Sequence, residues 1–163
     1  QRSKLRQYAA VIEDQWKKSL AESVFKYAGS VYGDLAKLKI IVDSKGDASK
    51  VLKGYIKHWG ELKGFSLSLQ TGKKKLGETG AKLNRLIGFG PVMPNSSQVT
   101  DIDSHGNYVK SESPGIPEYM LHMLKVQNLM AEKFGVKARS NDKLKDLASM
   151  IKSVGNTSSA END

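Results

Sequence analysis

The stretch KGYIKHWGELKGFSLSLQ, residues 53–70, decides the fold of this chain. Its apolar side chains recur every three or four residues, which places them along one side of an α-helix. With Val51, two residues before the stretch, this stripe consists of Val51, Tyr55, His58, Leu62, Phe65 and Leu69. A helix with such a stripe needs other helices to cover it. We therefore predict a helical protein in which His58 occupies a position where an apolar side chain is expected.

His58 and Glu61 form the first candidate site. Three residues apart, they project within about 60° of each other on a helix with 3.6 residues per turn. A His and a Glu at this spacing on an inward face can share a metal ion, as they do in some helical bundles. Two interpretations stay open. Either the pair binds a metal, or the two side chains hydrogen-bond each other or a neighbouring helix and bind nothing.

Three glycines, Gly54, Gly60 and Gly64, interrupt the same predicted helix. Each costs roughly 1 kcal/mol relative to alanine in a helix interior. Gly60 and Gly64 are four residues apart and so lie on one side. We expect a neighbouring helix to approach the backbone there, and a flat ligand is the less common alternative.

The composition limits the classes of function. A chain of 163 residues forms one domain or part of one. The net charge is +9, but lysines are scattered over every predicted helix and arginine is scarce, so we expect no specific nucleic-acid partner. The absence of cysteine excludes disulfides and Cys-ligated metals. No apolar run approaches the roughly 18 residues that a transmembrane helix needs.

Amphipathic patterns predict further helices on both sides of this stretch. A long helix from about residue 2 to 28 is predicted to end at Gly29, with Trp16 in the core; its stripe is Leu5, Tyr8, Ala9, Ile12, Trp16, Leu20, Val24 and Tyr27. Asp34 is a plausible N-cap for a second, shorter helix through residue 42. The helix around residues 53–70 follows, and then a short one over residues 78–87. Since the chain starts at Gln1, already inside a helical pattern, we expect a processed product or a piece of a longer protein.

Residues 101–112 match the spacing of a calcium-binding loop, with Asp101, Asp103 and Glu112 as oxygen ligands. His105 departs from the pattern, because a histidine nitrogen suits calcium poorly. The alternative is a β-hairpin with strands at about 99–103 and 108–111, and this is the interpretation that we favour. Either feature would lie within a long irregular excursion over residues 88–117.

Two helices are predicted in the last third of the chain. One, from about 117 to 134, is rich in Met and stops at Gly135; it carries His122, a further candidate metal ligand. Residues 140–142 cap the last helix, which ends near Gly155. Residues 156–163 form a polar tail that we predict to be disordered. The fold class is all-α, a helical bundle over residues 1–155 with long amphipathic helices and one long irregular loop.

A family resemblance rests on residues 58–70, HWGELKGFSLSLQ. This segment resembles a signature of a bacterial family of unknown function related to the imelysins, and residues 16–21 fall where that family has a similar helix. His58 and Glu61 match the His and Glu of the G-x-H-x-x-E motif, whereas Ile56 stands in place of its glycine. The resemblance covers most of residues 1–155 as the C-terminal half of a longer protein.

This resemblance implies a helical protein with two bundle-like halves. It also implies export to the periplasm or the cell surface and an association with iron or haem. The remaining ligands of such a site would come from elsewhere, including the N-terminal half.

Two functions from different classes follow. The first is a non-catalytic binding protein that holds iron or haem near His58 and Glu61. The second is a structural or interaction module of a cell-surface assembly, in which another polypeptide covers the long helices. We do not expect an enzyme: HExxH, G-x-S-x-G and a Cys nucleophile are all absent from the sequence.

Overall fold

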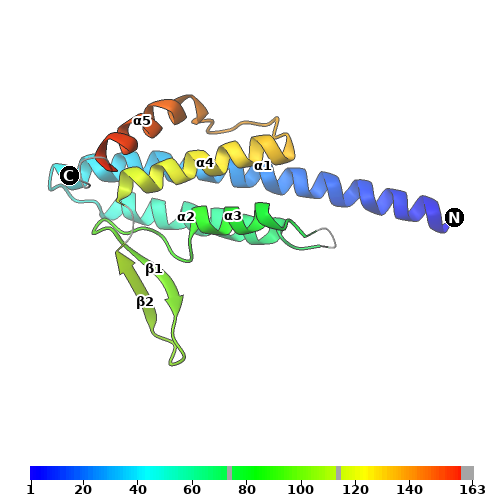
Figure 1. The fold of residues 1–163 in the computed structure, drawn as a ribbon, viewed down its shortest axis with the longest axis horizontal. Coiled ribbons are helices and arrows are strands. Elements are labelled where there is room, and N and C mark those ends of the chain that lie inside the picture. The colour runs from blue at the N-terminus through cyan, green and yellow to red at the C-terminus, as the bar shows by residue number, and fades with distance from the viewer. Residues whose placement is uncertain (73–74, 113–114, 159–163) are drawn as a thin grey trace.

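The computed structural model describes residues 1–72, 75–112 and 115–158. It confirms the predicted helical bundle with one small β-hairpin (Figure 1). The regular elements are α1 (Arg2–Asp43), α2 (Ser49–Leu69), α3 (Glu78–Ile87), β1 (Ser97–Ile102), β2 (Tyr108–Glu112), α4 (Ile116–Phe134), a 3₁₀ turn (Leu144–Asp146) and α5 (Leu147–Ser158).

The bundle is built around α1 and α4. Helix α1 packs against α2 and α4, while α3 and α5 both pack against α4 (Figure 1). The hairpin projects away from the helices, and the N-terminal part of α1 extends past the end of the bundle. The structure therefore has a packed centre with two projecting parts.

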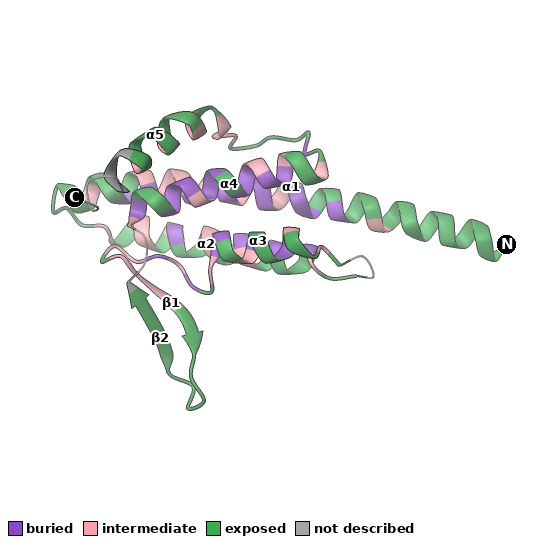
Figure 2. Cartoon of the chain, in the orientation of Figure 1, coloured by how far each residue is buried: buried purple, intermediate pink, exposed green. Residues whose placement is uncertain are grey.

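Apolar side chains from four helices fill the centre (Figure 2). The largest that are fully buried include Phe25 and Leu35 of α1, Tyr55 of α2, Leu83 of α3 and Met123 of α4. Burial of a side chain of this size stabilises the fold by roughly 1.5–3 kcal/mol. The buried face of α3 includes Leu83, Leu86 and Ile87.

Helix α1 does not end at Gly29, so the predicted break is wrong. It continues without interruption to Asp43, and Asp34 is an interior residue rather than an N-cap. The structure gives another reason for Gly29: a Cβ atom added there would lie 2.0 Å from the carbonyl oxygen of Asn141. The glycine allows the segment before α5 to pack directly on α1.

The glycines of α2 do not mark close helix packing, which corrects a second expectation. A Cβ atom added at Gly54, Gly60 or Gly64 would meet nothing within 4 Å. Gly60 and Gly64 are exposed, on the side of α2 that faces away from the bundle. Their cost in helix propensity is therefore not offset by a contact.

Residues 97–112 form the hairpin, as favoured above. Strands β1 and β2 are antiparallel, with Ser97 opposite Glu112 and Ile102 opposite Tyr108, and the register shifts between Val99 and Asp101. Before the hairpin, Val92 is fully buried and forms an isolated bridge with Gln98. This residue fixes the irregular segment after α3 to the bundle.

The C-terminal region agrees with the prediction in part. Helix α4 has Pro117 in its first turn and ends at Gly135, which adopts the left-handed conformation with φ 57°. The last helix begins as a 3₁₀ turn, and α5 then runs past Gly155 to Ser158. Residues 156–158 of the predicted disordered tail are therefore helical, and residues 159–163 lie outside the described residues.

Across the described ranges, no helix combines the length and the apolar composition needed to cross a membrane.

Candidate functional site

His58 pairs with a residue of another helix. Its Nδ1 lies 2.6 Å from Oδ2 of Asp34, in the C-terminal third of α1. The side chain of Asp34 is 14% exposed and that of His58 is 33% exposed, so water is partly excluded from the pair. The ring of Tyr27, which stacks on Phe65 at 5.5 Å, lies 6.2 Å from the imidazole ring. Of the two interpretations for His58, the structure matches a hydrogen bond to a neighbouring helix.

A polar hollow of about 310 Å³ surrounds this pair. Its walls come from α1, α2 and the segment before α5, and they carry two lysines, Lys37 and Lys143. Asn141 closes one side; its amide donates a hydrogen bond to Ser30 at 2.9 Å. The hollow combines one carboxylate, one imidazole and two ammonium groups, so it suits a small polar ligand better than an apolar one.

Glu61, the predicted partner of His58, does not take part in this pair. It is half-buried on α2, and the imidazole is turned to Asp34 instead. Among the described residues, no group of three or more His, Asp or Glu side chains is arranged to hold a metal ion. His58 and Asp34 at hydrogen-bond distance would have to separate before a metal could enter between them.

His122, the second candidate ligand, lies elsewhere in the bundle. It is half-buried on α4 with its ring edge-on to Tyr119, 6.0 Å between centroids. Burial lowers the pKa of His122, and the neighbouring Lys125 lowers it further. Its contacts are with Tyr119 and Leu86, whereas those of His58 are with Asp34 and Tyr27, so the structure does not bring the two histidines together.

The three calcium-loop residues do not form a common site. Asp103 is at the tip of the hairpin, where its carboxylate accepts hydrogen bonds from the backbone amides of His105 and Asn107. Asp101 accepts one from Ile102. Glu112 is at the base, opposite Ser97. Five strand residues separate tip from base, roughly 16 Å at 3.3 Å per residue, so the backbone positions of Asp103 and Glu112 lie far apart.

A network of buried polar groups was not predicted from the sequence. Trp59 donates a hydrogen bond to the Tyr119 hydroxyl at 2.8 Å, and that hydroxyl donates to the carbonyl of Ile87 at 2.6 Å. Lys63 reaches the carbonyl of Gly88 at 2.7 Å, and desolvation lowers the pKa of its ammonium group. These bonds join α2 and α4 to the end of α3, so their role is structural.

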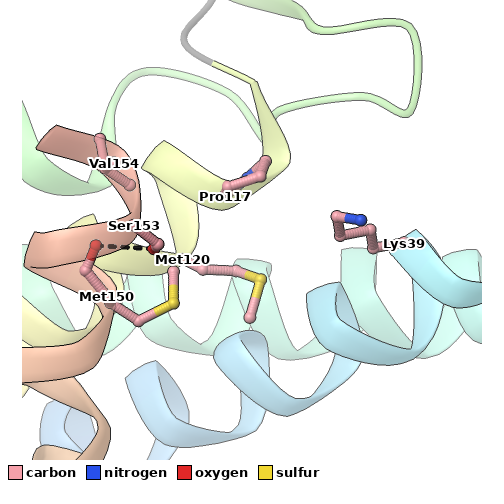
Figure 3. A pocket seen from close by; sticks show the side chains of 6 residues that line it. All are labelled: Lys39, Pro117, Met120, Met150, Ser153 and Val154. Carbon is pink, nitrogen blue, oxygen red and sulfur yellow. Dashed lines mark hydrogen bonds between the residues drawn. The ribbon is translucent and has the colours of Figure 1, made fainter. Parts of the chain in front are cut away.

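An apolar hollow of about 360 Å³ lies where α1, α4 and α5 meet (Figure 3). Met120 and Met150 are among the side chains that line it, and Ser153 donates a hydrogen bond from its hydroxyl to the carbonyl of Met150 at 2.9 Å. Lys39 at the edge is paired with Asp43 at 2.8 Å. The hollow has room for a small apolar group but presents no polar side chain that would orient a ligand.

The N-terminal part of α1, residues 2–16, extends beyond the bundle; we call it the overhang (Figures 1 and 2). Trp16 was predicted to be a core residue and is 64% exposed, so that prediction is wrong. The other large apolar side chains of the overhang are between 59% and 68% exposed: Leu5, Tyr8, Val11 and Ile12. The stripe read from the sequence exists, but the bundle covers it only from about Leu20 onward.

The exposed stripe of the overhang is not centred on the face of α1 that is most deeply buried in the bundle. At 100° per residue, its centre is rotated by roughly 100° from the centre of the buried face of α1, which includes Ala21, Val24 and Ala28. The side of α1 that carries Trp16 also carries Asp34, 18 residues or about five full turns further on, and Asp34 contacts His58 of α2. The exposed stripe therefore lies on the same side of α1 as α2, which ends at Leu69.

Comparison with protein-family models, with curated proteins and with solved structures finds no match to this chain. The imelysin-like resemblance, the iron or haem role, the export and the absence of enzymatic activity therefore stay predictions.

Proposed function

We propose that this protein is a helical interaction module that binds an amphipathic helix of another polypeptide along the overhang. The observation that carries the proposal is the overhang seam, which we define as Leu5, Ala9, Ile12 and Trp16. Its three large side chains are each at least 64% exposed, in the part of α1 that extends past the bundle (Figure 2).

The spacing of the seam favours a helical partner. Its residues follow one another at intervals of four, three and four, which is the spacing of the two core positions in a coiled coil. Such a seam is narrow, and one helix running alongside can cover it. Burial of each large side chain contributes roughly 1.5–3 kcal/mol before the entropy of association is subtracted, which is enough for a reversible complex.

A photo-crosslinking experiment tests this function. A benzophenone amino acid replaces Tyr8, which flanks the seam, and in a matched control it replaces Gln7, which projects from the other side of the helix. In cells that naturally produce the protein, we expect one defined polypeptide adduct from position 8 and none from position 7. Equal labelling at both positions, or no adduct at either, would contradict the proposal.

A metal or haem role is a second candidate, and the polar hollow around His58 and Asp34 is the observation in its favour. It would need further ligands than these two side chains, since tight metal sites use three or four protein ligands. Elemental analysis and a visible absorption spectrum of the protein from its natural source test it, with His58→Ala as the control. A metal or haem that is lost on this substitution would support the candidate, whereas a blank in both proteins would remove it.

A further inference from the structure

We propose that the helix bound by the overhang is the overhang of a second copy of this chain, in antiparallel orientation. The inference rests on the interaction function above and adds the identity and the register of the partner. In the register that covers the whole seam, two residues of the two copies lie opposite each other when their residue numbers sum to 21. Leu5 then faces Trp16 of the second copy, and Ala9 faces Ile12 of the second copy.

This register matches side-chain sizes across the two helices. Ala9 is the small residue of the seam, and it meets the branched Ile12 rather than another large side chain. Every layer therefore contains an apolar pair, and the small residue lets the two backbones approach near the centre of the overlap. The overlap of the seams, residues 5–16 of each copy, is roughly 18 Å long at 1.5 Å per residue.

Charge complementarity selects the antiparallel orientation. Arg6 and Glu13 lie on the same flank of the seam, seven residues apart. The two-fold axis of an antiparallel pair brings each flank against the same flank of the other helix. Arg6 then comes within about two residues, roughly 3 Å along the axis, of Glu13 of the second copy. The two-fold symmetry produces this ion pair twice. Glu13, which is 3.3 Å from Lys17 of its own chain, would then contact both Lys17 and Arg6 of the second copy.

A parallel pair lacks this match, because it would place the Arg6 and Glu13 flank against the opposite flank. That flank carries Gln1, Tyr8 and Gln15, which offer no charge. Arg6 and Glu13 would be left without an interhelical ion pair. The charge pattern therefore favours one orientation of a second copy.

The structure also leaves room for the second copy. Beyond the seam, the same side of α1 carries Ser19, an exposed and small polar residue that would lie opposite Arg2 of the second copy. In the antiparallel arrangement the two bundles lie at opposite ends of the paired overhangs. The interface is small, so we expect a dimer that dissociates in the micromolar range.

Sedimentation velocity on the purified full chain, over a range of concentrations, measures this association. We expect a reversible monomer–dimer equilibrium that Ile12→Lys abolishes. Ile12 is 68% exposed, so the thermal unfolding of the bundle should stay unchanged in this variant. A monomer at all concentrations, or a dimer insensitive to Ile12→Lys, would overturn the second copy as the occupant.

Charge reversal tests the orientation. Arg6→Glu alone and Glu13→Arg alone should each weaken dimerisation by about tenfold, since two symmetric ion pairs become repulsive. The double variant should restore it, because both pairs are formed again with the signs exchanged. Gln7→Glu serves as the control for a charge change off the interface. Failure of the double variant to recover would contradict the antiparallel register.

Engineered cysteines test the register directly, because the chain has no cysteine of its own. Leu5→Cys mixed with Trp16→Cys should give a heterodimeric disulfide on mild oxidation, whereas either variant alone should not. A disulfide from Leu5→Cys alone would indicate a parallel pair and overturn the proposal.

If the purified protein is monomeric but position 8 crosslinks to a different polypeptide in cells, the second copy is excluded while the interaction function stands. No adduct and no dimer would overturn both.

Discussion

The imidazole of His58 and the carboxylate of Asp34, 2.6 Å apart, join the centre of α2 to the C-terminal third of α1. Both residues lie in helix interiors, and 24 positions separate them in the sequence. The pair thus links the two long helices by a side-chain contact. His58 is the polar residue among the apolar ones in the stripe of α2.

Removal of this carboxylate should destabilise the bundle. In Asp34→Ala the half-buried imidazole loses its partner, and we expect the free energy of unfolding to fall by about 1–2 kcal/mol. Urea unfolding measures the change. Asp14→Ala, which removes an exposed pair with Lys18, is the matched control and should change stability by less than about 0.5 kcal/mol. Equal effects of the two substitutions would mean that the His58–Asp34 contact contributes no more than a surface pair.

His122 should make the stability of the bundle depend on pH. Burial lowers the pKa of this histidine in the folded state below the ordinary value of 6.5, so the unfolded chain binds more protons as the pH falls through that value. Above about pH 6.5, His122 therefore does not lower the free energy of unfolding. As the pH drops from there towards the lower, folded-state pKa, that free energy decreases.

The test compares the wild type with His122→Gln, which stays neutral and keeps a hydrogen-bonding group. Urea midpoints from pH 8 down to pH 5 should fall less steeply in the variant, and the difference between the two proteins isolates His122 from Glu118 and the other carboxylates. Parallel curves over this range would contradict the prediction.

Alanine substitutions should separate glycines with and without a packing role. Gly60→Ala and Gly64→Ala place a methyl group in open space within a helix, so each should raise stability by about 1 kcal/mol. Gly29→Ala should instead destabilise the fold, because its methyl group would overlap the Asn141 carbonyl and the Gln127 amide. Thermal or urea unfolding measures all three variants. A stabilising effect at Gly29 would show that the segment before α5 moves away without cost.

The packing of the segment before α5 on α1 should depend on the polar residue Gln127. It is fully buried on α4, and its amide group donates to the carbonyls of Phe25 and Asn141 and accepts from the backbone amide of Lys143. Gln127→Leu leaves these backbone groups without partners and should cost about 1–3 kcal/mol. Asn128→Ala is the matched control: the amide of Asn128 donates a hydrogen bond to the exposed Glu132, so its loss should have a small effect in the same urea titration. A loss of similar size in both variants would contradict this role.

The sequence predicts helices well where a stripe is buried along its whole length. The stripes of α2, α3 and α4 lie in the core, and the ends of these helices fall within a few residues of their predicted positions. Gly135 and Pro117 gave reliable boundaries because their backbone preferences suit a helix end and a helix start. The same logic failed at Gly29, where a glycine serves close packing inside a helix rather than its end.

The site could be predicted only in part, for a similar physical reason. The stripe shows that His58 is turned inward, but it contains no information about which helix faces it; Asp34 was assigned to a helix cap because α1 was divided at Gly29. The sequence pattern also does not reveal that Trp16 is exposed. A seam that packs on a second polypeptide has the same period and composition as one that packs on its own bundle.

Helix α1 runs for 42 residues without a break, about 63 Å at 1.5 Å per residue, through both the overhang and the bundle. It therefore joins the overhang to the bundle as one rigid, unbroken helix. Because the overhang and the bundle share this helix, a force applied to the overhang reaches the His58–Asp34 contact as a twist or a shear between α1 and α2. The overhang and the packed part of α1 therefore keep a fixed direction relative to each other.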